Sequence, residues 1–533
     1  MQELPISISE FEELRAKRCL YIDKTRHVYT LLTKNRRSFL SRPRRFGKSL
    51  LLSTLTAALQ GKKELFQGLW MARSNYAWKP YGIIRLDFST FSTESLQEFK
   101  ESFLDAFIDI LETERLPPKS TTNLNVLVRH VVKHLYTKYQ AVAILIDEYD
   151  YPILHTLHNR KLAISIRSTL KSFSCVIKAL AKEIQFVFVT GVSAFSKSGL
   201  SSGLNNLDNL TLNKEFSDIC GYTDREIGLY FIKHLKHWAR CKEISYTKLR
   251  KELKTWYNGY CFKEGTLSIY SPFSFTCAVH IQEVNNFWFE SATPQFLLDE
   301  IQKLERKEES SFLSGKDFVG SMDTLQTFEI EDIPLIALLF QMGYLTLDTY
   351  DPTSQIYRLK YPNLEVKTSL HKHLLITLTR MAKWPFDCLL VHLVSALMQE
   401  NLDDFLEIIQ RIFSKIPYQI RKEDESFYHS TLQALFISAN IPSHAEYSTP
   451  EGRADIVLEL PSLIYIFELK VQHSAKKALH QIEQKKYYEP FLHSKRPVRA
   501  VGLSFAKLNR KTKSPAITYA TKKFVETKQS KKR

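Results

Sequence analysis

Residues 41–55, SRPRRFGKSLLLSTL, contain the second half of a phosphate-binding motif, and this stretch decides how the first part of the chain is interpreted. The full motif is G-x-x-x-x-G-K-[ST], and Gly47, Lys48 and Ser49 supply its last three residues. Arg42 stands where the first glycine belongs. Such a loop binds phosphate because consecutive backbone N–H groups converge on an anion at the N-terminus of a helix. We therefore expect a strand before the loop and a helix beginning near Lys48.

The missing glycine alters the loop but leaves it strongly basic. Pro43 has no backbone N–H to donate, and an arginine at position 42 does not adopt glycine conformations cheaply. One charge-assisted hydrogen bond contributes about 1.5–3 kcal/mol, which offsets one lost amide donor. The arginines that bring positive charge to the loop are Arg42, Arg44 and Arg45.

From this motif we predict an ATP site. Lys48 is expected to neutralise the β- and γ-phosphates, and the Ser49 hydroxyl to ligate Mg²⁺. The other expected nucleotide contacts are Arg44, Arg45 and Gly47. The alternative is a chance occurrence of GKS beside a solvated basic surface, so the motif needs a second, independent signal.

Short apolar runs alternate with helical stretches in the first half of the chain. Helical spacing is present around Phe99–Phe107 and around Leu127–Leu135. Nearly all-apolar strands separated by helices predict a parallel sheet covered on both faces, and hence an α/β fold. The strand-like runs are 38–43, 81–89, 141–150 and 184–192.

The second signal is the run AVAILIDEYD, which carries acidic residues where a parallel strand would end. We expect Asp147 to hold Mg²⁺ and Glu148 to orient or deprotonate an attacking water. One predicted strand separates this run from the loop, which is the arrangement of the additional-strand class of P-loop ATPases. On the next strand, Thr190 or Ser193 is a candidate sensor of the γ-phosphate, with an ordinary strand-end turn as the equal alternative.

Together these segments resemble the AAA-ATPase-like family, whose phosphate loop is typically written RPRRFGKS. The resemblance extends over about residues 4–300. It implies ATP binding by Lys48, Ser49 and Asp147, with Glu148 catalytic, and it makes the arginine at the first-glycine position a family feature. The segments that carry it are FLSRPRRFGKSLLLSTL, YIDKT, LIDEYDYPIL, VTGVSAFSKSGLSSGLNNL, GYTDREI, WYNGYCF and YSPFSF.

Two hallmarks of this family, SGLNNL and YNGY, have no chemical role that the residues themselves reveal. Their asparagines, Asn205, Asn206 and Asn258, are either polar sensors or turn formers. The aromatic residues Tyr257 and Tyr260 could stack on bases, but packing in a core is the favoured interpretation.

Near the C-terminus, GRADIVLELPSLIYIFELK (452–470) is typical of two strands joined by a Pro-Ser turn. A hairpin symmetric about that turn places Asp455 opposite Glu468, with Lys470 on the same face as Glu468. Facing carboxylates repel unless a cation lies between them, and Mg²⁺ or Mn²⁺ prefers such oxygen ligands. We therefore expect a metal that activates water, with Lys470 adding positive charge. A register slip of one residue would separate the carboxylates.

The alternative is an amphipathic hairpin with solvated charges. The predicted helices on either side of the hairpin argue against this alternative. The helix before it offers Glu425 as a third metal ligand, and the helix after it carries Gln481 and Tyr487. Roughly residues 400–506 resemble the PD-(D/E)XK nuclease superfamily, in the branch commonly fused to AAA-ATPase-like domains, where a helix Glu precedes GRAD, an E-x-K strand and a Q-I helix. The positions that match are Glu425, Asp455, Glu468, Lys470 and Gln481, with Glu423 or Asp424 as substitutes for Glu425.

The predicted organisation follows from these two sites. Its segments are an AAA-like P-loop NTPase domain at 1–300, a helical linking region at 301–415, an α/β restriction-endonuclease-like domain at 416–506, and a last strand with a basic tail at 507–533. Few strand signals occur between 300 and 420, and the polar stretch 303–317 fits a linker or an exposed loop.

Composition limits the class of protein. Of 533 residues, 44% are hydrophobic and 25% charged, as in soluble globular proteins. The net charge of +17 favours polyanions, either nucleic acid or an anionic membrane surface. The seven cysteines are scattered without a C-x-x-C pair, which favours a reducing compartment. With no signal-peptide core and no apolar run long enough to cross a bilayer, we expect a cytoplasmic protein.

Three functions fit the sequence. The first is an ATPase coupled to a Mg²⁺- or Mn²⁺-dependent nuclease acting on nucleic acid, DNA rather than RNA. The second is an ATP-switched module that binds nucleic acid or protein with an inactive nuclease fold, and the third is a signalling or scaffold protein. The intact set Asp455, Glu468 and Lys470 favours the first. We expect no membrane partner, and self-association is left open.

Overall fold

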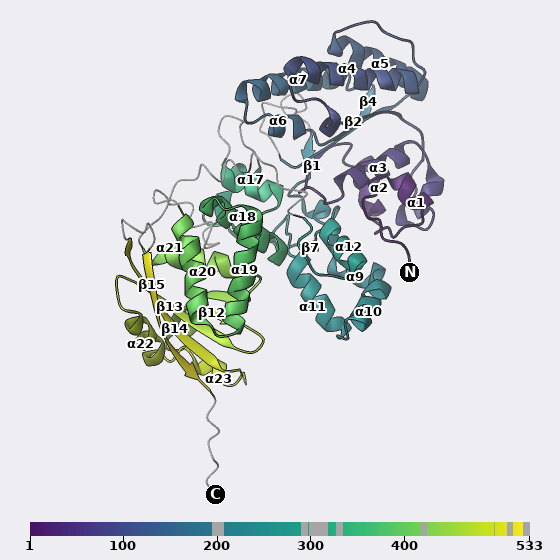
Figure 1. Ribbon diagram of the computed structural model, residues 1–533. Helices are drawn as coiled ribbons and strands as arrows, with labels where there is room; N and C mark the ends of the chain where they lie inside the picture. The colour runs from purple at the N-terminus through teal and green to yellow at the C-terminus, as the bar shows by residue number, and fades with distance from the viewer. Residues whose placement is uncertain are drawn as a thin grey trace. The chain divides into compact units, whose positions relative to one another are not determined.

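The computed structural model forms two compact units, each described here by itself (Figure 1). Unit 1 comprises Met1–Ile301 and Phe318–Val366, and unit 2 comprises Gln302–Asp317 and Lys367–Arg533. The boundary at residue 366 falls inside one helix, α18 (Leu364–Thr379). The structure describes residues 1–193, 207–288, 297, 318–326, 334–416, 424–494, 496–508 and 515–525.

A five-stranded parallel sheet organises unit 1, in the order β2-β3-β4-β1-β5. Every residue of β3 is buried, because this strand lies inside the sheet and helices cover both faces. Strand β4 lies between β1 and β3, which is the inserted strand that the additional-strand class requires. The strands are β1 (Arg37–Ser41), β2 (Gly82–Asp87), β3 (Val142–Asp147), β4 (Ile184–Gly191) and β5 (Asp208–Asn209).

The helices of unit 1 lie on both sides of this sheet, with α4, α5 and α7 on one side and α1, α2 and α3 on the other (Figure 1). The predicted aromatic spacing is confirmed, because Phe103 and Phe107 of α4 both pack on Phe173 of α7. The helices are α1 (Phe11–Ala16), α2 (Thr25–Thr33), α3 (Lys48–Leu59), α4 (Leu96–Thr113), α5 (Leu124–Tyr139), α6 (Tyr151–His155) and α7 (Arg160–Ala179), with short 3-10 turns at Lys63–Phe66, Trp70–Arg73, Phe88–Thr90 and Lys214–Phe216.

A second, helical layer of unit 1 has its own core. Trp238 and Tyr257 are fully buried there, and Leu20 and Ile22 from the N-terminal segment belong to the same core. Its elements are β6 (Tyr222–Thr223), α9 (Asp224–Tyr230), α10 (Ile232–Cys241), α11 (Tyr246–Tyr257), β7 (Ile269–Tyr270) and α12 (Pro272–Ile281). The N-terminal segment therefore joins the sheet to this helical layer.

The mostly helical middle of the chain also contains a small antiparallel sheet, in the order β8-β10-β9, that the sequence analysis did not predict. Most of β9 is exposed, so its residues lack the apolar alternation by which a strand is recognised. The elements are β8 (Val319–Ser321), α16 (Met322–Gln326), α17 (Leu335–Met342), β9 (Thr346–Asp351) and β10 (Ile356–Lys360).

Unit 2 is a mixed five-stranded sheet, in the order β11-β12-β13-β14-β15, in which only β13 and β14 run parallel. Phe467 of β13 packs on Phe405 and Phe436, and Ile464 and Ile466 share a core with Ile482 of α22. The elements after α18 are α19 (Lys383–Met398), α20 (Leu402–Lys415), α21 (Glu425–Ser438), β11 (Ser443–Thr449), β12 (Gly452–Glu459), β13 (Ile464–Val471), α22 (Ala475–Gln484), α23 (Glu489–Leu492), β14 (Val498–Leu508) and β15 (Pro515–Phe524).

Some predicted features lie outside the described residues. These are Asn205 and Asn206, the stretch 303–317, Glu423 and the end of the basic tail after Val525.

Candidate functional site

The phosphate loop, residues 42–49, connects β1 to α3 as predicted. Gly47 is the N-cap of α3 and has φ +91, a left-handed conformation that favours glycine. A Cβ placed at Gly47 would meet nothing within 4 Å, so the loop has open space in front of it. Arg45 also has positive φ, at +65. The loop thus presents the N-terminus of a twelve-residue helix to an open region, as a phosphate cradle requires.

The side chain of Lys48 forms hydrogen bonds within the phosphate loop. This side chain is buried, and its Nζ donates hydrogen bonds to the carbonyl oxygens of Arg42 (3.1 Å) and Pro43 (3.2 Å). Both acceptors are neutral carbonyls, so a phosphate at the loop would be a stronger partner for the ammonium group.

Arg42 is buried and bonded to backbone carbonyls, which corrects the expectation that its side chain is available to a phosphate. Its side chain is 1% exposed and donates to the carbonyls of Ser41 (2.8 Å), Thr211 (2.9 Å) and Phe216 (2.8 Å). The guanidinium also stacks over Phe262, 4.0 Å from the ring centre. Burial lowers the pKa of Arg42 to about 10. At the first-glycine position, Arg42 thus anchors the loop to the segment that contains Thr211 and Phe216.

The other two arginines are nearer to solvent. Arg44 is half-buried with Nη2 3.5 Å from Nε2 of His155, and burial together with this positive neighbour lowers the pKa of His155. Arg45 is exposed, and its guanidinium lies 4.8 Å from the centre of the Phe273 ring. These are the two arginines of the loop whose positions leave them able to approach a bound anion.

The acidic end of β3 lies at the same sheet edge as the loop. The register pairs Leu40 of β1 with Thr190 of β4, and Ile146 of β3 with Val189, so the carboxyl ends of these strands coincide. Asp147 is buried there, and its Oδ1 accepts hydrogen bonds from the Thr190 hydroxyl and from the backbone N–H of Glu148 (3.1 Å). Thr190 therefore contacts the predicted Mg²⁺ ligand directly.

Glu148 has a strained backbone and a shifted pKa. Its φ is +47, in the left-handed region that a residue with a side chain rarely adopts. Burial raises the pKa of Glu148, while the positive charge of Lys48 opposes the shift. That electrostatic contact connects the end of β3 to the phosphate loop, and a base with a raised pKa suits proton transfer from water.

Asp150 is a residue of this edge that the sequence analysis did not single out. It is 1% exposed and accepts hydrogen bonds from the N–H groups of Val192 and Ser193 (2.6 Å) and from the Ser193 hydroxyl (2.5 Å). Burial raises the pKa of Asp150, and these donors oppose the shift. Asp150 fixes the end of β4, and the signal that could have revealed it is the third acid in DEYD.

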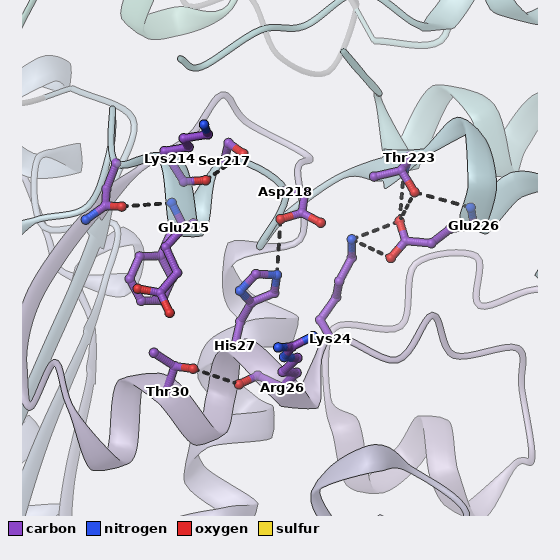
Figure 2. A network of polar contacts seen from close by, with 12 residues as sticks. Lys24, Arg26, His27, Thr30, Lys214, Glu215, Ser217, Asp218, Thr223 and Glu226 are labelled. Carbon is purple, nitrogen blue, oxygen red and sulfur yellow. Dashed lines mark hydrogen bonds and ion pairs between the residues drawn. The ribbon is translucent and has the colours of Figure 1, made fainter. Parts of the chain in front are cut away.

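A mostly apolar cavity borders the phosphate loop. Its wall combines the YIDKT and GYTDREI segments with the start of α3, and residues that line it include Leu20, Ile22, Gly47, Leu51, Gly221 and Tyr222. Figure 2 shows a network of polar contacts that includes Lys24, one of the residues lining the cavity; Lys24 pairs with Glu226 (2.7 Å) and His27 with Asp218 (3.2 Å). Although burial opposes ionisation, the bond from His27 holds the pKa of Asp218 at about 2. These pairs fasten α2 to the segment that carries Tyr222.

The C-terminal hairpin has the predicted register. Ile456 pairs with Phe467 and Glu459 with Ile464, and continuing this ladder sets Asp455 opposite Glu468. Oδ2 of Asp455 accepts a hydrogen bond from the backbone N–H of Leu469 (2.8 Å). The structure therefore places both predicted carboxylates at the same end of the hairpin.

Glu468 is buried with one oxygen unpaired. The side chain is 1% exposed; Oε1 accepts a bond from Nζ of Lys470 (3.0 Å), while Oε2 has no hydrogen-bond partner among the described residues. Burial, and then the charge of Asp455, raise the pKa of Glu468 to about 7. Burial also raises the pKa of Asp455, against the opposing effects of Leu469 and Lys470. Carboxylates on a solvated hairpin surface would show neither this burial nor these raised pKa values.

Glu425, at the start of α21, completes what we call the carboxylate–lysine cluster: Glu425, Asp455, Glu468 and Lys470. Nζ of Lys470 lies 3.3 Å from Oε1 of Glu425 as well as 3.0 Å from Glu468. His429 of the same helix is 2.9 Å from the backbone oxygen of Asp455, and so fixes α21 against β12.

Gln481 and Tyr487 lie together but outside this cluster's hydrogen bonds. Nε2 of Gln481 is 3.5 Å from the Tyr487 hydroxyl, and Tyr487 packs against Gly452 at the start of β12. Within the described parts of unit 2, no hydrogen bond or ion pair joins either side chain to Asp455, Glu468 or Lys470.

The carboxylate–lysine cluster fits a cation through two carboxylates rather than three. Where the chain is described, no group of three or more His, Cys, Asp or Glu side chains is arranged to hold a metal ion. Lys470 engages both Glu425 and Oε1 of Glu468, which leaves Asp455 and the unpaired Oε2 of Glu468 as the facing groups. Burial and the charge of Asp455 raise the pKa of Glu468, and a divalent ion with oxygen ligands at the unpaired Oε2 would offset both effects.

We expect the stability of unit 2 to fall as the pH rises from 4.5 towards about 7, because Glu468 must ionise in the folded state. Its folded pKa lies above the ordinary value of 4.5, so the folded state binds the proton more tightly than the unfolded state does. The loss amounts to at most about 3 kcal/mol of unfolding free energy. Denaturant unfolding at several pH values measures it.

The Glu468→Gln variant is expected to lose this pH dependence. Burial also raises the pKa of Glu365, in unit 1, to about 7. Glu365→Gln is therefore measured in parallel, and it should remove the part of the pH dependence that comes from Glu365. An unchanged slope in Glu468→Gln would show that Glu468 ionises normally in the folded protein.

Comparisons with known proteins agree with this architecture. Residues 5–201 match the AAA-ATPase-like family, described as predicted AAA-ATPase, and residues 423–514 match the PD-(D/E)XK nuclease superfamily. The class is thus an AAA-ATPase-like domain joined to a PD-(D/E)XK nuclease superfamily domain. A relative from Azotobacter chroococcum mcd 1, described as an uncharacterized protein in vnfD 5'region, is 30% identical over 529 residues, covering 96% of this chain and 97% of the relative. The chain belongs to the same family as this relative. No solved structure matches the chain.

In the described residues, no single helix is both long and apolar enough to span a bilayer. Helices α18 and α19 reach that length and composition only when taken together, and they are bent by 115° at their junction.

Proposed function

We propose that the protein binds and hydrolyses ATP at the phosphate loop of unit 1 and hydrolyses nucleic-acid phosphodiesters, DNA in the first place, at the carboxylate–lysine cluster of unit 2. The observation that carries the proposal is the buried Glu468 carboxylate with one oxygen unpaired, next to Asp455 and Lys470. An unpaired buried acceptor costs about 1–3 kcal/mol. Glu365 also has an unpaired buried Oε2, but Glu468 differs from it because a second carboxylate, Asp455, faces it and Lys470 lies 3.0 Å from its other oxygen.

At the phosphate loop, Lys48 would exchange its carbonyl partners for the β- and γ-phosphates, and the α3 N-terminus would supply N–H donors. Ser49 and Asp147 would hold Mg²⁺, and Thr190 would keep the Asp147 carboxylate oriented. Glu148 would accept the proton of the attacking water. The apolar cavity beside Gly47 would receive the base of the nucleotide.

At the carboxylate–lysine cluster, Asp455 and Glu468 would hold Mg²⁺ or Mn²⁺, with Glu425 as a further ligand if Lys470 releases it. The ion supplies a Lewis acid and an activated water to the phosphodiester. Lys470 would stabilise the negative charge that develops on the phosphate. The Leu469 N–H keeps the Asp455 carboxylate directed along β13. Gln481 and Tyr487 would act from the adjacent helix as positioning residues.

Replacing Glu148 by glutamine is expected to leave ATP bound but slow its hydrolysis by about 10²- to 10⁴-fold, because glutamine cannot accept the proton. The variant keeps the shape of a side chain that burial already drives towards its neutral form, so folding is preserved. Filter retention of radiolabelled ATP and release of phosphate measure the two effects. Glu183→Gln, at the opposite end of β4, is the matched control. Equal hydrolysis by Glu148→Gln and wild type would remove Glu148 from the mechanism.

The proposal as a whole is tested by incubating the purified protein with Mg²⁺ or Mn²⁺ and plasmid DNA or RNA, with and without ATP. We expect cleavage that needs the metal and responds to ATP. A gel shift without cleavage would instead support an ATP-switched binding module with an inactive nuclease fold. Absence of both at modest salt would contradict any nucleic-acid function.

A further inference from the structure

Four residues outside the segment that matches the ATPase family pack directly on the phosphate loop. We call Tyr260, Phe262, Trp288 and Gly343 the loop clamp. The Tyr260 ring lies 4.7 Å from that of Phe46, and Phe262 lies under the Arg42 guanidinium. A Cβ at Gly343 would stand 2.6 Å from Cγ of Pro43, so only glycine permits this approach. The YNGY hallmark thus has a packing role, and Asn258 forms a turn by accepting the Gly259 N–H (2.7 Å).

Trp288 of the loop clamp makes a hydrogen bond with the phosphate loop. It is fully buried, and its indole Nε1 donates to the backbone oxygen of Arg44 (3.1 Å). In a trans peptide the C=O and the following N–H point in opposite directions. Holding the Arg44 carbonyl outward therefore turns the N–H of Arg45 towards the other side of the loop, where an anion would lie.

Trp288 is itself held by Glu365. Oε1 of this buried carboxylate accepts the backbone N–H groups of Phe287 (2.7 Å) and Trp288 (3.0 Å). The Trp288 ring also packs edge-on against the Tyr344 ring, and the two ring centres are 5.0 Å apart. Glu365 belongs to the first turn of α18, the helix by which the chain continues into unit 2.

We propose that Trp288, held in place by Glu365, is a positioning residue that keeps the phosphate loop in its anion-binding conformation. This inference rests on the proposed ATP binding. When Lys48 turns to a phosphate, it releases the carbonyls of Arg42 and Pro43, whereas Trp288 continues to hold the next carbonyl. Without that bond the Arg44–Arg45 peptide is free to rotate and to present its oxygen to the anion.

The test compares two buried tryptophans. Trp288→Phe removes the indole N–H but keeps an aromatic ring, and we expect the Kd for N-methylanthraniloyl-ATP with Mg²⁺ to rise about tenfold, because a buried acceptor loses its donor. Trp238→Phe is the matched control, since Trp238 is equally buried and its Nε1 has no hydrogen-bond partner among the described residues. It should lower Tm by a similar amount and leave the Kd unchanged.

A second pair of variants covers the case in which Trp288→Phe does not fold. Glu365→Gln keeps an acceptor for both N–H groups and should retain a Kd within about twofold of wild type, whereas Glu365→Leu should weaken binding like Trp288→Phe. Wild-type Kd values in both Trp288→Phe and Glu365→Leu would overturn the inference. Failure of the wild-type protein to bind the nucleotide would instead overturn the proposed ATP site.

Discussion

The Asp455→Asn variant is expected to fold normally and to lose nuclease activity by about 10²- to 10³-fold or more, the range typical for removal of one preorganised electrostatic group. Asparagine keeps an oxygen that can accept the Leu469 N–H, so the hairpin stays intact. It removes a negative charge that a metal ion requires and leaves Glu468 as the one carboxylate of the facing pair. Plasmid cleavage with Mg²⁺ is the measurement, with Asp455→Ala beside it.

Glu459→Gln is the matched control for this experiment. Glu459 lies on the same strand, β12, but its carboxylate pairs with Arg496 (2.8 Å) and not with the carboxylate–lysine cluster. It should cleave like wild type. If Asp455→Asn also cleaves like wild type with Mg²⁺, the assignment of the nuclease site is wrong. If it binds plasmid without cutting, the site is catalytic and not needed for binding.

The second large effect is expected at Lys48. Lys48→Gln should lower ATP affinity by about 10²-fold or more, because at least one charge-assisted bond and its Coulomb energy disappear. Glutamine keeps an N–H donor for the carbonyls of Arg42 and Pro43, so this variant separates loss of charge from collapse of the loop. Lys48→Ala removes both and should abolish binding. Equilibrium binding of the fluorescent ATP analogue measures the loss.

A lysine beyond the other end of α3 provides the control. Lys62 is half-exposed and pairs with Glu12, so Lys62→Gln removes one surface charge next to the same helix. Its affinity for ATP should equal that of wild type. ATP hydrolysis by Lys48→Ala at the wild-type rate would exclude the phosphate loop as the ATPase site.

The hairpin of unit 2 was predictable because its determinants are local. A Pro-Ser turn fixes the register, and a side-chain period of two then decides which residues face one another, as the pair Ile456 and Phe467 confirms. The parallel sheet of unit 1 was predictable for a related reason. Strands buried on both faces are nearly all apolar, and β3 is the clearest example.

What the sequence could not reveal depends on partners far along the chain. Nothing in RPRR distinguishes Arg42 from its neighbours, because the carbonyls that bind it belong to Thr211 and Phe216. Edge strands were missed for another reason. Strand β11 is polar and only partly buried, so its sequence, SHAEYST, lacks the apolar alternation of a strand that faces a core.

The helix α18 begins in unit 1 and ends in unit 2, and this decides how the protein can be divided. Cleavage between residues 366 and 367 would cut this helix after its third residue and leave unsatisfied backbone groups on both fragments. An ATPase fragment that keeps Glu365 must therefore extend at least to Thr379. A fragment that ends at Val366 would lose most of the helix that carries Glu365, and with it the support for this carboxylate.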